Sequence, residues 1–192
     1  MDFGTIRSIK GDLILSPSLP RLAIRYSPDF IYLGDLQYIA RKTYHVEAFI
    51  FITPNSMGHA TRLLLVHFQG FLESREGSYE FVSQPVVNLE GEEYQYERYF
   101  INLENDFKRF PGSDLAHSAD YIRQRAYTLA GDMIHQRFQR LVSPDGRHLF
   151  SISYLEANND PTLTDARLKQ DTQAAQALQE RALSSFSIVH EP

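Results

Sequence analysis

The chain contains no cysteine, no long apolar run and no excess of basic residues. Without cysteine, disulfide scaffolds, thiolate zinc sites, iron–sulfur clusters and cysteine nucleophiles are excluded. No run approaches the roughly 18 apolar residues that a membrane-spanning helix needs, so no membrane span is predicted. The formal net charge of −5 argues against a surface that binds nucleic acid.

The composition is instead typical of one soluble globular domain. Of the 192 residues, 43% are hydrophobic and 12% are aromatic, which is enough apolar material for a substantial core. The first residues lack the basic and apolar regions of a signal peptide, so a cytoplasmic location is expected. We predict a single α+β domain over residues 1–157, followed by a linker and an Ala/Gln-rich helix over residues 158–192.

The first hundred residues are predicted to be mostly strand. β-branched and aromatic residues dominate residues 30–53, and a second apolar run follows over residues 63–72. The turn-forming residues 54–58 lie between these segments and predict that they form a long hairpin. Further strands are expected over residues 79–87 and 94–103.

The second half of the chain is predicted to contain helices. Residues 118–142 place apolar side chains on one broad arc at helical spacing, with Ser118 as the N-cap, and predict a long helix. Residues 147–155 alternate like a strand, and residues 164–183 predict a helix with a thin apolar stripe. The expected α+β fold is a twisted, mainly antiparallel sheet of about six to eight strands, packed against one long helix and followed by a C-terminal helical arm.

Common catalytic and cofactor motifs are missing from the sequence. It contains no GxGxxG, P-loop, GxSxG or HExxH pattern. His45 and Glu47 match the HxE of zinc deaminases, but the paired cysteines of those enzymes are absent. The sequence therefore identifies no cofactor, and we do not predict a metal site.

One polar cluster is expected within the predicted hairpin. If the turn is centred on Met57, Glu47 lies opposite His67 and His45 lies opposite Gln69, with roughly 5 Å between cross-strand Cβ atoms. Imidazole and carboxylate groups together can perform acid–base chemistry near neutral pH, so His45, Glu47 and His67 are the candidate catalytic residues. The aromatic side chains expected beside them are Phe49 and Phe51. The alternative is that these are ordinary polar residues on an exposed face.

Arg137 falls within the apolar arc of the predicted helix, together with Arg123. A guanidinium there requires a path to water or a carboxylate partner, and Glu47 and Glu97 are the candidates. Partnered with Glu47, Arg137 would join His67 and could bind the charge of an anionic ligand. The alternative is a structural ion pair or a side chain that reaches solvent.

A tyrosine-rich strand is a further candidate for a binding surface. Tyr94, Tyr96 and Tyr99 surround Arg98 within the strand predicted over residues 94–103. Such strands line ligand cavities, because the ring buries area while its hydroxyl keeps a hydrogen bond. They also form half-buried sheet faces without any ligand.

Three classes of function are compatible with these features. We favour a non-catalytic domain that binds a small-molecule ligand or a partner in a Tyr/Phe-lined pocket. The first alternative is a small enzyme of the hydrolase, isomerase or lyase type that uses the His/Glu cluster as an acid–base or metal site. The second is a protein that self-associates into a homo-oligomer through its helices, since a thin-striped helix folds poorly alone.

Overall fold

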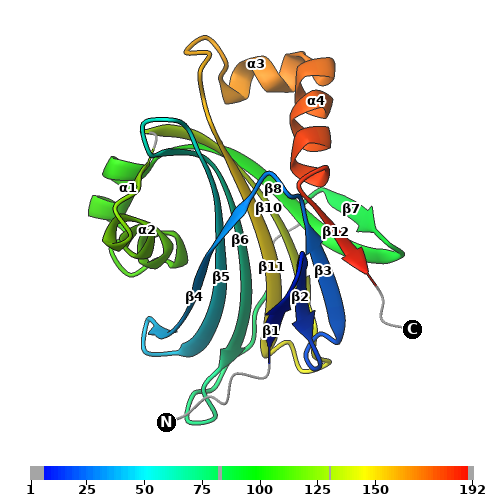
Figure 1. Ribbon diagram of the computed structural model, residues 1–192. Coiled ribbons are helices and arrows are strands. Elements are labelled where there is room, and N and C mark those ends of the chain that lie inside the picture. The colour runs from blue at the N-terminus through cyan, green and yellow to red at the C-terminus, as the bar shows by residue number, and fades with distance from the viewer. Residues whose placement is uncertain (1–6, 82–83, 130, 190–192) are drawn as a thin grey trace.

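The computed structural model describes residues 7–81, 84–129 and 131–189, and within them the chain forms two sheets and four helices (Figure 1). The large sheet has the strand order β4 (Ile31–Ala40), β5 (Tyr44–Pro54), β6 (His59–Phe71), β11 (His148–Ala157), β10 (Asp132–Leu141), β8 (Glu92–Asn102) and β7 (Val86–Leu89). The short strand β9 (Thr128–Leu129) pairs in parallel with β6. The small sheet has the order β1 (Ser8–Lys10), β2 (Leu13–Ser16), β3 (Leu22–Tyr26) and β12 (Phe186–Val189).

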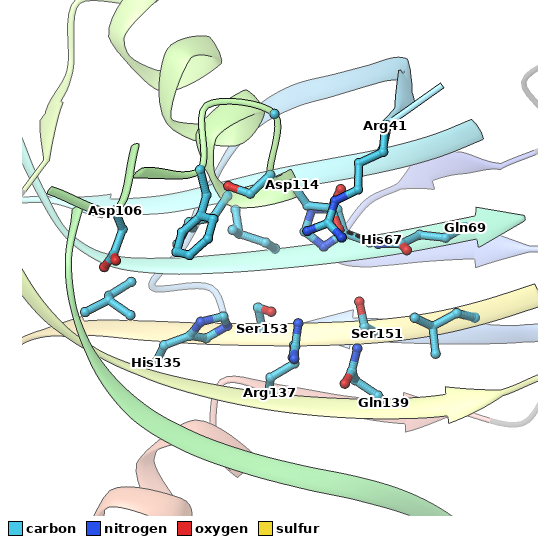
Figure 2. Close-up of a pocket in the computed structure, with 18 of the residues that line it drawn as sticks. Arg41, His67, Gln69, Asp106, Asp114, His135, Arg137, Gln139, Ser151 and Ser153 are labelled. Carbon is cyan, nitrogen blue, oxygen red and sulfur yellow. Dashed lines mark hydrogen bonds between the residues drawn. The ribbon is translucent and has the colours of Figure 1, made fainter. Parts of the chain in front are cut away.

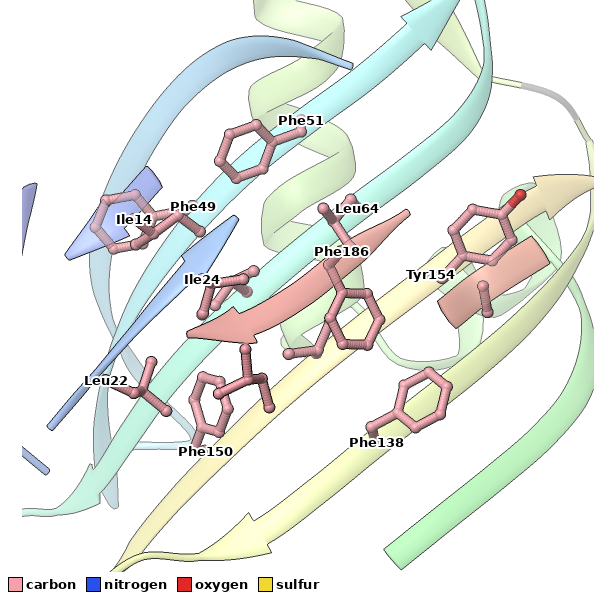
Figure 3. Packing of buried hydrophobic residues seen from close by; sticks show 14 of the residues in the cluster. Ile14, Leu22, Ile24, Phe49, Phe51, Leu64, Phe138, Phe150, Tyr154 and Phe186 are labelled. Atoms are coloured by element: carbon pink, nitrogen blue, oxygen red, sulfur yellow. The ribbon is translucent and has the colours of Figure 1, made fainter. Parts of the chain in front are cut away.

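The predicted mixture of helices with a mainly antiparallel sheet is confirmed, and the described residues form eight strands in the large sheet and four in the small one. The small sheet packs against one face of the large sheet, and the apolar side chains of both meet there (Figure 3). Ile14 and Ile24 face Phe49, Phe51 and Phe150 across this layer. Because both sheets bury an apolar face, they form a sandwich with a continuous core.

The opposite face of the large sheet is covered in part by two short helices, α1 (Leu103–Arg109) and α2 (Asp114–Gln124) (Figure 1). Ile122 of α2 and Leu103 of α1 are buried against Ile50, Leu65 and Met133 of the sheet. Both faces of the large sheet are therefore covered, the first by the small sheet and the second in part by helices α1 and α2. A candidate site lies on the second face.

The predicted hairpin forms as β5 and β6, but its register differs from the prediction. The turn is where it was expected, because Pro54 pairs with Ala60. Thr53 then pairs with Arg62, so Thr61 is one extra residue in β6. Such a bulge shifts all later pairs by one residue and moves each partner to the other face. Glu47 consequently pairs with Phe68 instead of His67.

The long helix predicted over residues 118–142 is wrong. Helix α2 begins after its N-cap Ser113 and ends at Gln124, where Ala126 takes a left-handed φ of 63°. Residues 132–141 form β10 instead. The small sheet and the helical pair bury opposite faces of this strand, so its apolar residues do not alternate cleanly. The apolar residues of this segment are therefore spaced in a way that also fits one broad face of a helix.

The C-terminal segment forms two helices and a strand instead of one helix. Asp171 separates α3 (Asp165–Gln170) from α4 (Thr172–Leu183) and caps α4 by accepting a hydrogen bond from the amide of Ala174. Leu168 and Leu178 pack against Ile134 of the large sheet. Strand β12 then pairs with β3 and contributes to the core between the sheets.

Two further predictions concern the region before β8 and the helices. The strand predicted over residues 79–87 includes residues 82–83, which lie outside the described residues, and in the described part a strand begins only at Val86. Strand β8 forms close to the predicted limits of residues 94–103. In the described part of the chain, no helix has the length and apolar character to cross a membrane.

Candidate functional site

A cavity of about 480 Å³ lies between the large sheet and the helical pair α1/α2 (Figure 2). Strands β6, β11 and β10 form what we call its floor, and the segment from α1 to the start of α2 covers it. Tyr44, Tyr79 and Arg41 line one end, while Tyr99 and Phe107 line another part of the wall. The cavity thus combines aromatic walls with a polar floor, which is a common composition for small-molecule sites.

Two serines on β11 account for the space above the floor. Successive residues of a strand point to opposite faces, so Ser151 and Ser153 face the cavity while Phe150, Ile152 and Tyr154 enter the core between the sheets. A serine side chain is much shorter than those on the neighbouring strands. The centre of the floor is therefore lower than its edges, and the surrounding polar side chains converge above it.

The strand register places the polar floor residues side by side. Ser151 lies directly between His67 on β6 and Gln139 on β10. Ser153 lies between Leu65 on β6 and Arg137 on β10. Directly opposed residues on neighbouring strands have Cβ atoms about 5 Å apart, so adjacent floor side chains can contact one ligand. Figure 2 shows the side chains of His67, Ser151, Ser153, Arg137 and Gln139 projecting from the three strands into the same space.

Two buried histidines of the floor have ring nitrogens that no described residue hydrogen-bonds. His67 and His135 are only 3% and 4% exposed. Among the residues that the structure describes, none hydrogen-bonds either ring nitrogen of His135 or the Nε2 atom of His67. Buried polar atoms are nearly always paired, and an unpaired one costs about 1–3 kcal/mol. Both rings line the cavity, so a bound molecule could supply the missing partners.

Both histidines are held in the neutral form. Burial lowers the pKa of His135 well below its ordinary value, and the positive charge of Arg137 lowers it further. Burial also lowers the pKa of His67, although the carboxylate of Asp114 opposes this effect. A neutral imidazole offers one donor and one acceptor, so each ring can bind either kind of group.

A hydrogen-bond network fixes the start of α2 above the floor. Asp114 accepts hydrogen bonds from the Tyr38 hydroxyl at 3.0 Å and from the Gln69 amide at 2.7 Å. The Tyr79 hydroxyl donates to Gln69 at 3.4 Å. Burial raises the pKa of Tyr38, and the nearby Asp114 carboxylate raises it further. These contacts connect α2, β4 and β6, and they occupy both carboxylate oxygens of Asp114.

Arg137 reaches the cavity beside an acidic neighbour. It is the direct cross-strand partner of Glu97 on β8, one of the two partners that the sequence suggested. Its Nε and Nη2 atoms both donate to Oε2 of Glu97, at 3.2 and 2.5 Å. Gln84 also donates a hydrogen bond to Glu97. The pair arises from strand pairing and not from a helix that covers the sheet.

The structure separates the three predicted catalytic residues. His67 lines the cavity, but Glu47 lies on the other face of the sheet and forms an ion pair with Arg7 at 2.7 Å. A Cβ atom added at Gly70 would meet the rings of His45 and His148, so these two histidines lie next to each other over that glycine. The bulge at Thr61 thus divides the predicted cluster between the two faces.

The predicted ligand-binding residues are divided in the same way. Gln69 and Arg137 line the cavity. The remaining five lie elsewhere. Phe49, Phe51, Tyr94 and Tyr96 pack in the core between the sheets, and Arg98 contacts helix α4. Tyr96 donates a hydrogen bond to Gln136 at 2.8 Å, and Arg98 donates to the backbone of Ala175 at 3.1 Å.

Tyr99 of the tyrosine-rich strand lines the cavity, and five further residues of the site were not predicted, namely His135, Gln139, Ser151, Ser153 and Asp114. The strand predicted over residues 147–155 already placed Ser151 and Ser153 on one face, opposite the apolar side chains. Within residues 132–141, His135, Arg137 and Gln139 recur at every second position. Interpreted as a strand, this spacing would have indicated a second polar face beside the serines.

The site carries no sign of a metal centre, and comparisons identify no family. Within the described residues, no three His, Asp or Glu side chains are grouped so that they could hold a metal ion. Comparison of the chain with protein-family models, curated proteins and solved structures found no match. The function must therefore be argued from the cavity itself.

Proposed function

We propose that the protein is a non-catalytic binding protein that holds a small molecule in the cavity between the large sheet and the helical pair α1/α2. The observation that supports this most is the presence of His67 and His135, which are buried, line the cavity and have ring nitrogens left unpaired by the part of the chain that the structure describes. A ligand that hydrogen-bonds them would remove the cost of burying unpaired polar atoms.

The walls of the cavity support the same proposal. Tyr44 and Tyr79 lie with their ring centroids 5.5 Å apart, and both pack on Phe71. Tyr99 packs on the His135 ring at 4.7 Å. Aromatic side chains of this kind provide apolar contact area for a ligand, while the floor provides hydrogen bonds that orient it. We therefore expect a ligand with an apolar or aromatic body and a polar group.

The alternatives have less support. The enzyme hypothesis depended on Glu47 lying beside His67, and the sheet separates these residues. The assembly hypothesis depended on free apolar surface of the C-terminal helix, whereas Leu178 is buried within the chain. A cytoplasmic location, self-association as a homo-oligomer and the lack of nucleic-acid binding stay predictions from the sequence.

Filling the cavity tests the proposal. Ser153→Phe places an aromatic ring at the lowest part of the floor and is expected to weaken binding of the neutral fluorescent probe N-phenyl-1-naphthylamine by at least about tenfold. The probe's fluorescence is titrated with the wild-type protein and with each variant. Ser187→Phe, which makes the same change at an exposed position of β12, serves as the control and should bind like the wild type.

Two outcomes would contradict the proposal. One is that Ser153→Phe folds and still binds the probe with wild-type affinity, which would place the probe elsewhere. The other is that Ser187→Phe loses as much affinity, which would make the effect non-specific. If overpacking prevents Ser153→Phe from folding, Ser153→Leu makes the same test with a smaller side chain.

A further inference from the structure

We infer that the ligand is an organic monoanion whose oxyanion group binds above Ser153 to the free edge of the Arg137 guanidinium. This inference rests on the proposed function and specifies the ligand that the cavity would take.

The contact with Glu97 leaves part of the Arg137 guanidinium available. Glu97 accepts from Nε and Nη2 through a single oxygen, and within the described residues no acceptor is bonded to Nη1. The Arg137 side chain is 33% exposed and lines the cavity. A guanidinium binds oxyanions through several N–H groups in one plane, so a free edge facing a cavity suits a carboxylate or a sulfonate.

The floor around Arg137 offers further hydrogen-bond donors beside the guanidinium. Gln139 and His135 flank it on β10, and Ser151 and Ser153 lie beside it on β11. Each of the four side chains can donate a hydrogen bond, and among the described residues none of them has an acceptor; His135 is also buried with both ring nitrogens unpaired. Such a group of donors favours a ligand that brings acceptor oxygens.

The acidic residues that face the cavity are already hydrogen-bonded. Both oxygens of Asp114 accept bonds, from Tyr38 and Gln69. Asp106 accepts a bond from the backbone amide of Asn102. Neither carboxylate belongs to the floor, since both come from the segment above it. Their charges still oppose a multiply charged ligand, so the cavity favours a ligand with a single negative charge.

Two fluorescent probes with the same ring system test the inference. 1-Anilinonaphthalene-8-sulfonate carries one sulfonate, and N-phenyl-1-naphthylamine lacks it. The wild-type protein is expected to bind the sulfonate probe about tenfold more tightly than the neutral probe. Arg137→Gln should remove most of this preference by weakening sulfonate binding about tenfold, while neutral-probe affinity changes less than about twofold.

The neighbouring acid provides a variant with the opposite effect. Glu97→Gln removes the charge that competes for Arg137 and is expected to strengthen binding of the sulfonate probe a few-fold. The matched control is Arg140→Gln. Arg140 lies on the same strand and pairs with Glu92 at 3.0 Å, but it belongs to the other face of the sheet. This control should leave the ratio of the two affinities unchanged.

The possible results separate this inference from the proposed function. The inference fails and the binding site stands if both probes bind, if Ser153→Phe blocks them, and if Arg137→Gln leaves the ratio of the two affinities unchanged. If Arg140→Gln lowers the ratio as much as Arg137→Gln, or if Glu97→Gln weakens sulfonate binding, the inference also fails. If the wild type binds neither probe, the proposed function fails. Arg137→Lys, which keeps the charge, provides the comparison if Arg137→Gln does not fold.

Discussion

Replacing Arg7 with methionine is expected to lower the free energy of unfolding by about 3–5 kcal/mol. Arg7 lies between the two sheets, where its Nη1 atom contacts Glu47 at 2.7 Å and its Nε atom donates to Ser16 at 3.0 Å. Its guanidinium also stacks 3.9 Å from the centre of the Phe68 ring. The side chains of Arg7 and Glu47 are only 14% and 8% exposed. Losing the cation would leave the Glu47 carboxylate buried without a counter-charge.

Urea unfolding of paired variants measures this effect. Arg25→Met removes an exposed pair with Asp12, in which both side chains are more than half exposed, and should cost less than about 1 kcal/mol. Adding Glu47→Gln to Arg7→Met should recover much of the loss, because the amide carries no charge. A loss of less than about 1 kcal/mol in Arg7→Met would show that the pair does not stabilise the sandwich.

The second large effect is a loss of stability in acid. The pKa values of His67 and His135 are lowered mainly by burial, so both rings stay neutral in the folded protein below the usual histidine pKa of about 6.5. The unfolded chain takes up these protons first. The two histidines therefore make their full contribution to the free energy of unfolding above about pH 6.5. This contribution falls as the pH drops toward their folded-state pKa values. Each histidine contributes up to about 1.4 kcal/mol per pH unit in this window.

Urea unfolding at pH values between 5 and 8 tests this expectation. The slope of the free energy of unfolding against pH reports how many more protons the unfolded chain binds than the folded one. His135→Gln should lower this number by about one, because the group that titrates on unfolding is gone. His59→Gln alters an exposed histidine and should keep the wild-type slope. If the wild type and His135→Gln lose stability equally on acidification, the buried ring of His135 is not the source of the acid sensitivity.

Local patterns in the sequence predicted the strands β5, β6, β8 and β11, but they missed β10 and could not show the register. Turn-forming residues correctly placed the β5/β6 turn, and the alternation in residues 147–155 correctly assigned Phe150, Ile152 and Tyr154 to one apolar face. No comparably clear pattern in the sequence marks the bulge at Thr61. Its hydroxyl donates to the Thr53 carbonyl at 3.1 Å, a contact that exists only after the strands have paired. One extra residue therefore separated Glu47 from His67.

The polar site was hidden by burial on two faces. A strand that is covered on both sides does not show a simple alternation of apolar and polar residues, and a helix then fits the pattern equally well. This is what happened in residues 132–141, where Phe138 enters the core and Arg137 faces the cavity. His67, Gln69 and Arg137 were identified from their chemistry, whereas their arrangement with Ser151 depends on strand order, which periodicity does not contain.

Nuclear magnetic resonance of the histidine side chains can show directly whether the cavity binds a small molecule. Uniformly ¹⁵N-labelled protein is titrated with 1-anilinonaphthalene-8-sulfonate while the ring nitrogen signals are followed. We expect the signals of His67 and His135 to shift and saturate together, while those of exposed His59 and of His148, which lies over Gly70 on the other face, stay in place. Saturable probe binding that leaves His67 and His135 unchanged, or the absence of saturable binding, would contradict the proposed site.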